Sequence, residues 1–124
     1  MSARKPVEWI GSARSDLRKF PQDVRRVMGQ AIDDAQLGTE HPAAKALKGF
    51  GGRSVLEIVD DFDGETYRAV YSVRFAGAVY ALHAFQKKSK KGIGTPRHEV
   101  DLIRARLKRA EEHYRTNYPK GAKP

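Results

Sequence analysis

Three consecutive segments in the middle of the chain show the alternation of strands, and they restrict the fold more than any other feature. The segments are SVLEIVDDF, TYRAVYSVRF and AVYALHAFQ, separated by Asp63-Gly64 and Ala76-Gly77. Such turn residues between alternating segments are typical of hairpins. In the second segment Arg68, Val70, Ser72 and Arg74 lie on one face and the aromatic residues on the other. We therefore expect an antiparallel meander that is apolar on the helix side and mixed or basic on the other.

Apolar residues at helical spacing flank this meander on both sides. Ser12 is a candidate N-cap for a first helix, which Pro21 ends, and a second helix then runs from Pro21 to Gly38. The last helix opens at Thr95 and Pro96. The residues that set the spacing are Val24, Val27, Met28, Ala31, Ile32 and Ala35 in the second helix, and Val100, Ile103, Leu107, Ala110 and Tyr114 in the last.

The remaining segments complete the predicted architecture. Lys5 to Ile10 indicates an opening edge strand, and Ala43 to Leu47 indicates a short helical turn. The predicted fold class is α+β with the order β-α-α-β-β-β-α, in which a helical hairpin and a C-terminal helix pack against one face of a small antiparallel sheet. With 124 residues in total, residues 1–118 are expected to form a single domain and residues 119–124 a polar tail.

The composition excludes several classes of site. The chain has no cysteine, which excludes disulfides, thiolate catalysis and cysteine zinc sites. Its four histidines are scattered and it has no HExxH motif, so we expect neither a metal site nor a small-molecule cofactor. No apolar run is long enough to cross a bilayer and no secretory signal opens the chain, so no membrane partner and a cytoplasmic location are expected.

Positive charge is concentrated in one part of the sequence. The chain has a formal net charge of +9, and residues 66–98 contain seven basic residues and no Asp or Glu. A field of one sign usually has a polyanion as its partner. The basic residues of this stretch are Arg68, Arg74, Lys87, Lys88, Lys90, Lys91 and Arg97. A cluster of solvated lysines that protects a strand edge is the alternative explanation.

These cations could support cleavage of RNA through its own 2′-hydroxyl. That reaction needs a base for the hydroxyl, positive charge at the phosphorane and an acid for the leaving 5′-oxygen. A lysine among other cations can serve as the base, while arginine suits the phosphate. His83 could transfer protons beside the lysines, but strand alternation places it with Val79, Ala81 and Phe85, so a core histidine is the alternative. Tyr80 is open to stacking on a base.

The combination of motifs resembles the RelE/ParE superfamily of bacterial toxins, in particular its phage-related HigB-like branch. The resemblance covers nearly the whole chain. It rests on AQLG at residues 35–38, on KALKGFGG at residues 45–52 before VLEI, on the strands TYRAVYSVRF and AVYALHAFQKKSKK, and on Thr95-Pro96. Glu57-Ile58-Val59 departs from the family, since many members carry an arginine after this glutamate.

The resemblance implies a toxin that binds the ribosome and cuts messenger RNA without metal. A cognate antitoxin with a helix-turn-helix domain would neutralise it. Arg68 matches the arginine in the family's central strand, and Lys87 and Lys88 match its FxKK segment after the third strand. These three are the expected catalytic residues, which contact or activate the scissile phosphate. Lys48 and Arg53 match basic residues before the second strand. Arg74, Lys90, Lys91 and Arg97 are expected to steer RNA. The superfamily also contains gyrase inhibitors of the same fold, so gyrase inhibition stays open, as does a basic RNA-binding phage accessory protein.

Overall fold

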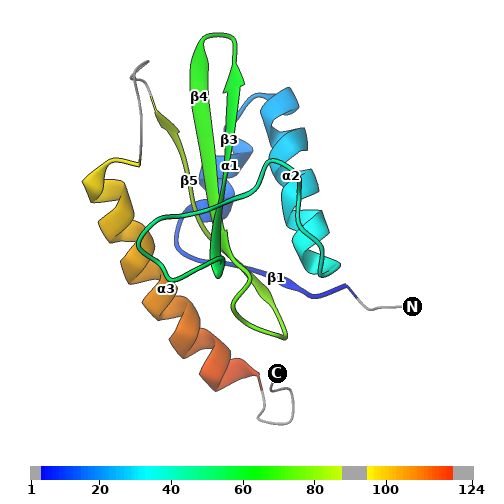
Figure 1. Ribbon diagram of the computed structural model, residues 1–124, viewed down its shortest axis with the longest axis vertical. Helices are drawn as coiled ribbons and strands as arrows, with labels where there is room; N and C mark the ends of the chain where they lie inside the picture. The colour runs from blue at the N-terminus through cyan, green and yellow to red at the C-terminus, as the bar shows by residue number, and fades with distance from the viewer. Residues whose placement is uncertain (1–3, 88–94, 119–124) are drawn as a thin grey trace.

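One five-stranded sheet forms the centre of the molecule (Figure 1). The computed structural model of the chain describes residues 4–87 and 95–118. The strands lie in the order β1-β5-β4-β3-β2; β1 is parallel to β5, and the other neighbours are antiparallel. Their bounds are Val7–Trp9 for β1, Lys45–Ala46 for β2, Val55–Phe62 for β3, Glu65–Ser72 for β4 and Val79–Lys87 for β5.

In the part of the chain that the structure describes, three helices accompany the sheet, and each begins near its predicted start. α1 covers Ala13–Arg18, α2 covers Gln22–Gln36 and α3 covers Arg97–Asn117. Pro21 and Pro96 directly precede α2 and α3 with φ of −57°, an angle that proline imposes and that leads into a helix. The predicted α+β class and the helical hairpin are therefore confirmed. No helix in the described ranges is long and apolar enough to span a membrane.

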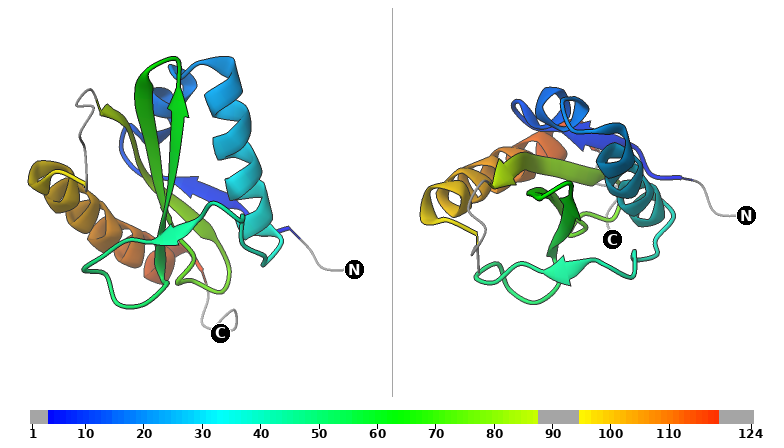
Figure 2. Two further views of the ribbon diagram at one scale, coloured as in Figure 1. Left: turned by 45° about the horizontal axis from the view of Figure 1, so that its top comes forward. Right: turned by 90° about the horizontal axis from the view of Figure 1, so that it is seen from above.

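The helices cover both faces of the sheet, which differs from the expectation of one open face. α2 and α3 lie on opposite sides of the central strands (Figure 2). Each fully buried aliphatic side chain contributes about 1.5–3 kcal/mol, so each helix is held firmly. Two separate clusters of buried side chains result. The cluster on the α2 side includes Val24, Met28, Ala31, Leu56, Ile58 and Tyr67. The cluster on the α3 side includes Val55, Val70, Leu82, Ile103, Leu107 and Ala110.

A bulge in β5 changes which side chains share a face. Val70 of β4 lies opposite His83, whereas the next residue, Tyr71, lies opposite Ala81, so Leu82 is an extra residue in β5. One extra residue reverses the alternation of all side chains beyond it. Directly paired residues share a face, so His83 and every second residue after it lie on the α3 side with Val70. The residues moved to that side are His83, Phe85 and Lys87.

The segment before β3 is a strand, so the helical turn expected from Ala43 to Leu47 is wrong. Lys45 pairs with Glu57 and Ala46 with Leu56, and the Leu47 amide donates to the carbonyl of Val55. These contacts satisfy backbone groups at the outer edge of β3 that would otherwise lack partners. Pairing with a distant strand thus outweighs the local preference for a helix.

The rings of Tyr71 and Tyr80 are buried, but their hydroxyl groups differ in their contacts. Tyr80 Oη lies 2.7 Å from His113 Nδ1, while Tyr71 Oη is buried with no hydrogen-bond partner among the described residues. Tyr80 is 0% exposed, so it is not available to stack on a nucleobase. A buried hydroxyl without a partner reduces stability, because it loses its bonds to water.

We expect Tyr71→Phe to leave stability unchanged at pH 7 or to raise it by up to about 1 kcal/mol. Burial raises the pKa of Tyr71 from 10.0 to about 12, and Glu40 and Asp34 add to this. Between these pKa values the unfolded chain releases the proton while the folded chain keeps it, so the stability of the wild type falls as pH rises from 10 to 12. The variant lacks this contribution.

Urea unfolding at pH 7, 10 and 11 measures both effects. The variant should lose less stability than the wild type between pH 10 and 11. Tyr80→Phe is the matched control, because it removes the contact with His113 and should cost about 1 kcal/mol at pH 7. A loss above 1 kcal/mol in Tyr71→Phe at pH 7 would mean that its hydroxyl has a partner.

Candidate nucleic-acid interface

A pocket of about 510 Å³ lies where β2, β3 and β4 meet the start of α3. Among the described residues, the cations that line it are Lys45 of β2, Lys48 just after β2, and Arg68 of β4, and the lysines are exposed. Glu57 is the carboxylate in its wall. We call this the Arg68 pocket, and its other walls include Thr95 and Val100. Cations around an open hollow are suited to bind a phosphate group.

Arg68 is held in a buried ion pair at the base of this pocket. Its side chain is 8% exposed, and its Nη1 donates to Oε2 of Glu57 at 2.8 Å. Thr95 Oγ1 donates to the same carboxylate oxygen at 3.0 Å and lies 3.5 Å from Arg68 Nη1. The guanidinium is therefore fixed in orientation, and Glu57 compensates its positive charge. The expectation of an exposed basic strip without carboxylates is wrong at this position.

The bulge brings Lys87 to the same side of the sheet as Arg68. Arg68 lies opposite Phe85, and Lys87, two residues further along β5, lies opposite Thr66. Diagonal neighbours of this kind have Cα atoms roughly 7–8 Å apart, within reach of long side chains. Lys87 is half-buried. Arg68 and Lys87 therefore share one face of the sheet, although Lys87 does not line the Arg68 pocket, while Lys88, Lys90 and Lys91 lie outside the described residues.

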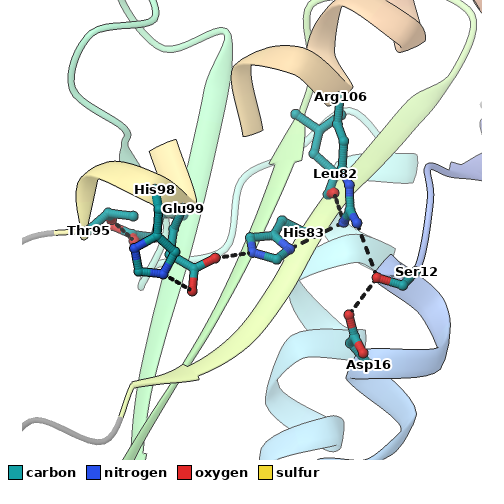
Figure 3. A network of polar contacts seen from close by, with 9 residues as sticks. Ser12, Asp16, Leu82, His83, Thr95, His98, Glu99 and Arg106 are labelled. Atoms are coloured by element: carbon teal, nitrogen blue, oxygen red, sulfur yellow. Dashed lines mark hydrogen bonds and ion pairs between the residues drawn. The ribbon is translucent and has the colours of Figure 1, made fainter. Parts of the chain in front are cut away.

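A chain of polar contacts runs beside these residues from α3 across β5 to α1 (Figure 3). His83 Nε2 lies 2.6 Å from Oε1 of Glu99, and its Nδ1 lies 3.2 Å from Nη1 of Arg106. Arginine can only donate, so Nδ1 is the acceptor and Nε2 carries the proton that is donated to Glu99. Nη2 of Arg106 donates to Ser12 Oγ at 3.1 Å, and Ser12 donates to Asp16.

Strand alternation alone misplaces His83, because the bulge at Leu82 reverses its side. The sequence therefore missed the contacts of His83 with Glu99 and Arg106, although the core position itself is confirmed by 7% exposure. Among residues 4–87 and 95–118, no three His, Asp or Glu side chains gather as ligands for one metal ion. The polar groups here bind one another and tie the first half of α3 to the sheet.

With this geometry known, comparisons with other proteins place the chain in a family. Residues 15–108 match the family described as phage derived protein Gp49-like (DUF891). The chain belongs to this Gp49-like family. No curated protein matches it.

A solved structure of RelE shows that this Gp49-like protein has the same fold, as the resemblance to the RelE/ParE superfamily predicted. The structure of a double arginine-to-alanine mutant of E. coli toxin RelE in the free state has 15% identity and a TM-score of 0.53, over 86% of this chain and 98% of that one. The RelBE2 toxin–antitoxin complex from Mycobacterium tuberculosis has 19% identity and a TM-score of 0.41, over 72% and 98% respectively.

The other predicted RNA contacts of the Gp49-like protein are distributed unevenly. Lys48 lines the Arg68 pocket and Arg97 is exposed at the first residue of α3. Arg53 is paired with Glu40 at 2.6 Å, Arg74 is paired with Glu111 of α3, and neither arginine lines the Arg68 pocket. Lys45 was missed, although the alternation in Lys45-Ala46-Leu47 could have indicated an exposed strand residue.

Proposed function

We propose that this Gp49-like protein is the toxin of a type II toxin–antitoxin pair and cleaves messenger RNA on the ribosome, in the cytoplasm. The Arg68 pocket is the observation that carries the proposal, because three cations surround a hollow large enough for a phosphate and its ribose. The RelE fold and the concentration of basic residues between residues 66 and 98 support it. The reaction uses protein side chains alone, with no metal or cofactor.

In the proposed reaction the 2′-oxygen of a ribose attacks the adjacent phosphorus, and the bond from phosphorus to the 5′-oxygen breaks. Lys87 or Lys88 accepts the proton of the 2′-hydroxyl, and a protonated lysine of the same group supplies one to the leaving oxygen. Arg68, oriented by Glu57, stabilises the extra negative charge of the phosphorane. The products are a 2′,3′-cyclic phosphate and a free 5′-hydroxyl.

The surrounding cations act on the RNA before the chemical step. Lys48, Lys90, Lys91 and Arg97 attract and align the strand, and Lys45 joins them at the pocket. Arg53 and Arg74 contribute less, because each is already paired with a carboxylate. A helix-turn-helix antitoxin is the partner that would neutralise the toxin when bound.

Expression in a bacterial host tests this function. The wild type should stop growth and translation, and messenger RNA should be cleaved in transcripts that are being translated. Lys87→Ala together with Lys45→Ala should lower cleavage at least about 100-fold, the lower limit for losing a proton-transfer group. Arg25→Ala together with Arg26→Ala, on the exposed side of α2, is the matched control with the same loss of charge and should stay toxic.

Primer extension on translated and untranslated transcripts maps the cleavage sites. Growth arrest with intact messenger RNA and induced DNA damage would contradict the nuclease activity and support gyrase inhibition instead. Absence of toxicity in the wild type would contradict both activities. Equal cleavage by the Lys45/Lys87 double variant and by the control variant would mean that the reaction occurs elsewhere.

A further inference from the structure

A second pocket with cationic walls lies on the other side of the loop formed by residues 47–50. It has a volume of about 530 Å³ and lies between this loop and the outer face of α3. Arg74, Arg104 and Lys108 line it, together with the carboxylates of Asp101 and Glu111. We call it the Arg104 pocket. Neither Arg104 nor Lys108 takes part in the proposed reaction.

Arg104 is held in place before any ligand arrives. Its guanidinium carbon lies 4.5 Å from the centre of the Phe50 ring, and its Nη1 donates to the carbonyl of Gly49 at 3.3 Å. A guanidinium has five N–H donors, so these contacts leave others available to a ligand. Holding the side chain in advance reduces the entropy lost on binding. Arginine in such a position is suited to a phosphate.

The charge of the pocket favours an anion even though carboxylates are present. Arg74 is paired with Glu111, so these two charges largely compensate each other. Lys108 follows Arg104 by one helical turn and lies on the same side of α3. Arg104 and Lys108 together exceed Asp101 by one positive charge. That excess is enough for one phosphodiester, which carries a single negative charge.

The two pockets share two walls, the loop and α3, where adjacent residues line the one pocket and the other. On the loop, Lys48 lines the Arg68 pocket and Gly49 lines the Arg104 pocket. On α3, Val100 lines the first and Asp101 lines the second. Neighbouring residues on both walls thus belong to different pockets. Because the loop and α3 continue from one pocket to the other, a single strand with regularly spaced phosphates can follow these two walls from the first pocket to the second.

We infer that the Arg104 pocket binds a second phosphate of the same RNA strand, on a nucleotide that flanks the one cut in the Arg68 pocket. This inference rests on the proposed function and names how that site holds its substrate. Arg104 contacts the phosphate with its fork of donors and Lys108 contacts it as a point charge. An acidic segment of a protein partner is the competing occupant, and the continuity of the two pockets favours the RNA strand.

Binding of a single-stranded 2′-O-methyl RNA oligonucleotide tests the inference, since this RNA cannot be cleaved through its 2′-oxygen. Lys108→Gln is compared with Arg109→Gln, its exposed neighbour on α3, which lies outside the pocket. Arg104→Gln is compared with Arg104→Lys, which keeps the charge but loses the fork. Thermal unfolding of every variant separates loss of binding from loss of folding.

We expect Arg104→Gln with Lys108→Gln to bind roughly 10-fold more weakly and to lower the slope of log K against log salt by about 0.7, the contribution of the one single-strand phosphate that the two side chains share. Arg109→Gln should match the wild type. If the wild type binds the RNA and Lys108→Gln binds it as tightly as Arg109→Gln does, the inference is overturned and the proposed function still stands. Failure of the wild type to bind RNA at low salt would overturn both.

A second measurement separates the competing occupant. The same variants are tested for neutralisation by the protein encoded beside the toxin gene. If Lys108→Gln keeps its RNA affinity and escapes neutralisation, the Arg104 pocket is a protein contact and the inference is overturned. Weaker RNA binding with normal neutralisation supports it.

Discussion

Glu57→Ala should lower the free energy of unfolding by about 3 kcal/mol, one of the largest effects of a single change in this chain. The substitution removes the carboxylate that pairs with Arg68 at 2.8 Å and leaves a buried positive charge without its partner. Removing one member of a buried pair costs about 3–5 kcal/mol. We expect the lower end because the Arg68 pocket gives the charge some access to water. Urea unfolding at pH 7 measures the loss.

Replacing both partners separates the structural role of Arg68 from its catalytic role. Glu57→Leu with Arg68→Met fills similar volume and should recover most of the stability, because apolar pairs often replace buried ion pairs without loss. RNA cleavage should be lost in this double variant, because Arg68 is no longer present. Glu40→Ala, which breaks the half-exposed pair with Arg53, is the control and should cost at most about 1 kcal/mol.

A stable double variant that still cleaves RNA would show that Arg68 only supports the fold. Equal losses in Glu57→Ala and Glu40→Ala would contradict the buried pair. The comparison matters because Arg68→Ala alone could abolish toxicity simply by unfolding the protein, so toxicity by itself does not identify a catalytic residue.

The pairing of Arg68 with Glu57 was available from the sequence in principle. The Asp63-Gly64 turn places Phe62 opposite Glu65, and counting back from it places Val59 opposite Arg68. Glu57, two residues from Val59, must then share the face of Arg68. The hairpins, the α2 stripe and the start of α3 were predicted on the same local grounds. Local spacing predicts the face of the sheet on which each strand side chain lies, as long as no extra residue is inserted in the strand.

The bulge in β5 is the feature that local spacing could not reveal. Nothing in Val79 to Lys87 marks Leu82 as an extra residue, and the carbonyl of Leu82 is bonded by Arg106 of α3, 24 residues away. The strand β2 was missed for a similar reason, because its partner Glu57 lies on another strand. The cover over the Arg68 face also arises from tertiary packing of α3, which no short segment encodes.

Arg106 is the residue on which the bulge depends most. Its Nη1 donates to the carbonyl of Leu82 at 3.0 Å and so satisfies the backbone of the residue that lacks a partner in β4. Gly11, at a φ of +59°, leaves room for the guanidinium, because a Cβ there would lie 2.9 Å from its Cζ. Burial lowers the pKa of Arg106, so its contacts must compensate for the loss of hydration.

We therefore expect Arg106→Ala to cost about 2–4 kcal/mol, since it removes charge-assisted hydrogen bonds and leaves the Leu82 carbonyl unsatisfied. Arg109→Ala, an exposed arginine one turn along α3, should change stability by less than about 0.5 kcal/mol. Arg106→Lys keeps the charge but lacks the fork, so it should recover only part of the loss. Chemical unfolding of the three variants gives these values.

Hydrogen exchange locates the effect, because loss of the bulge changes the register of only one pair of strands. In Arg106→Ala the amides of residues 83–87 should exchange faster than those of β3, while Arg109→Ala keeps the pattern of the wild type. Cleavage of RNA should fall together with this protection, since Lys87 shares the face of Arg68 only while Leu82 remains the extra residue. Unchanged exchange in β5 with a large loss of stability would place the role of Arg106 in holding α3 to α1 through Ser12 instead.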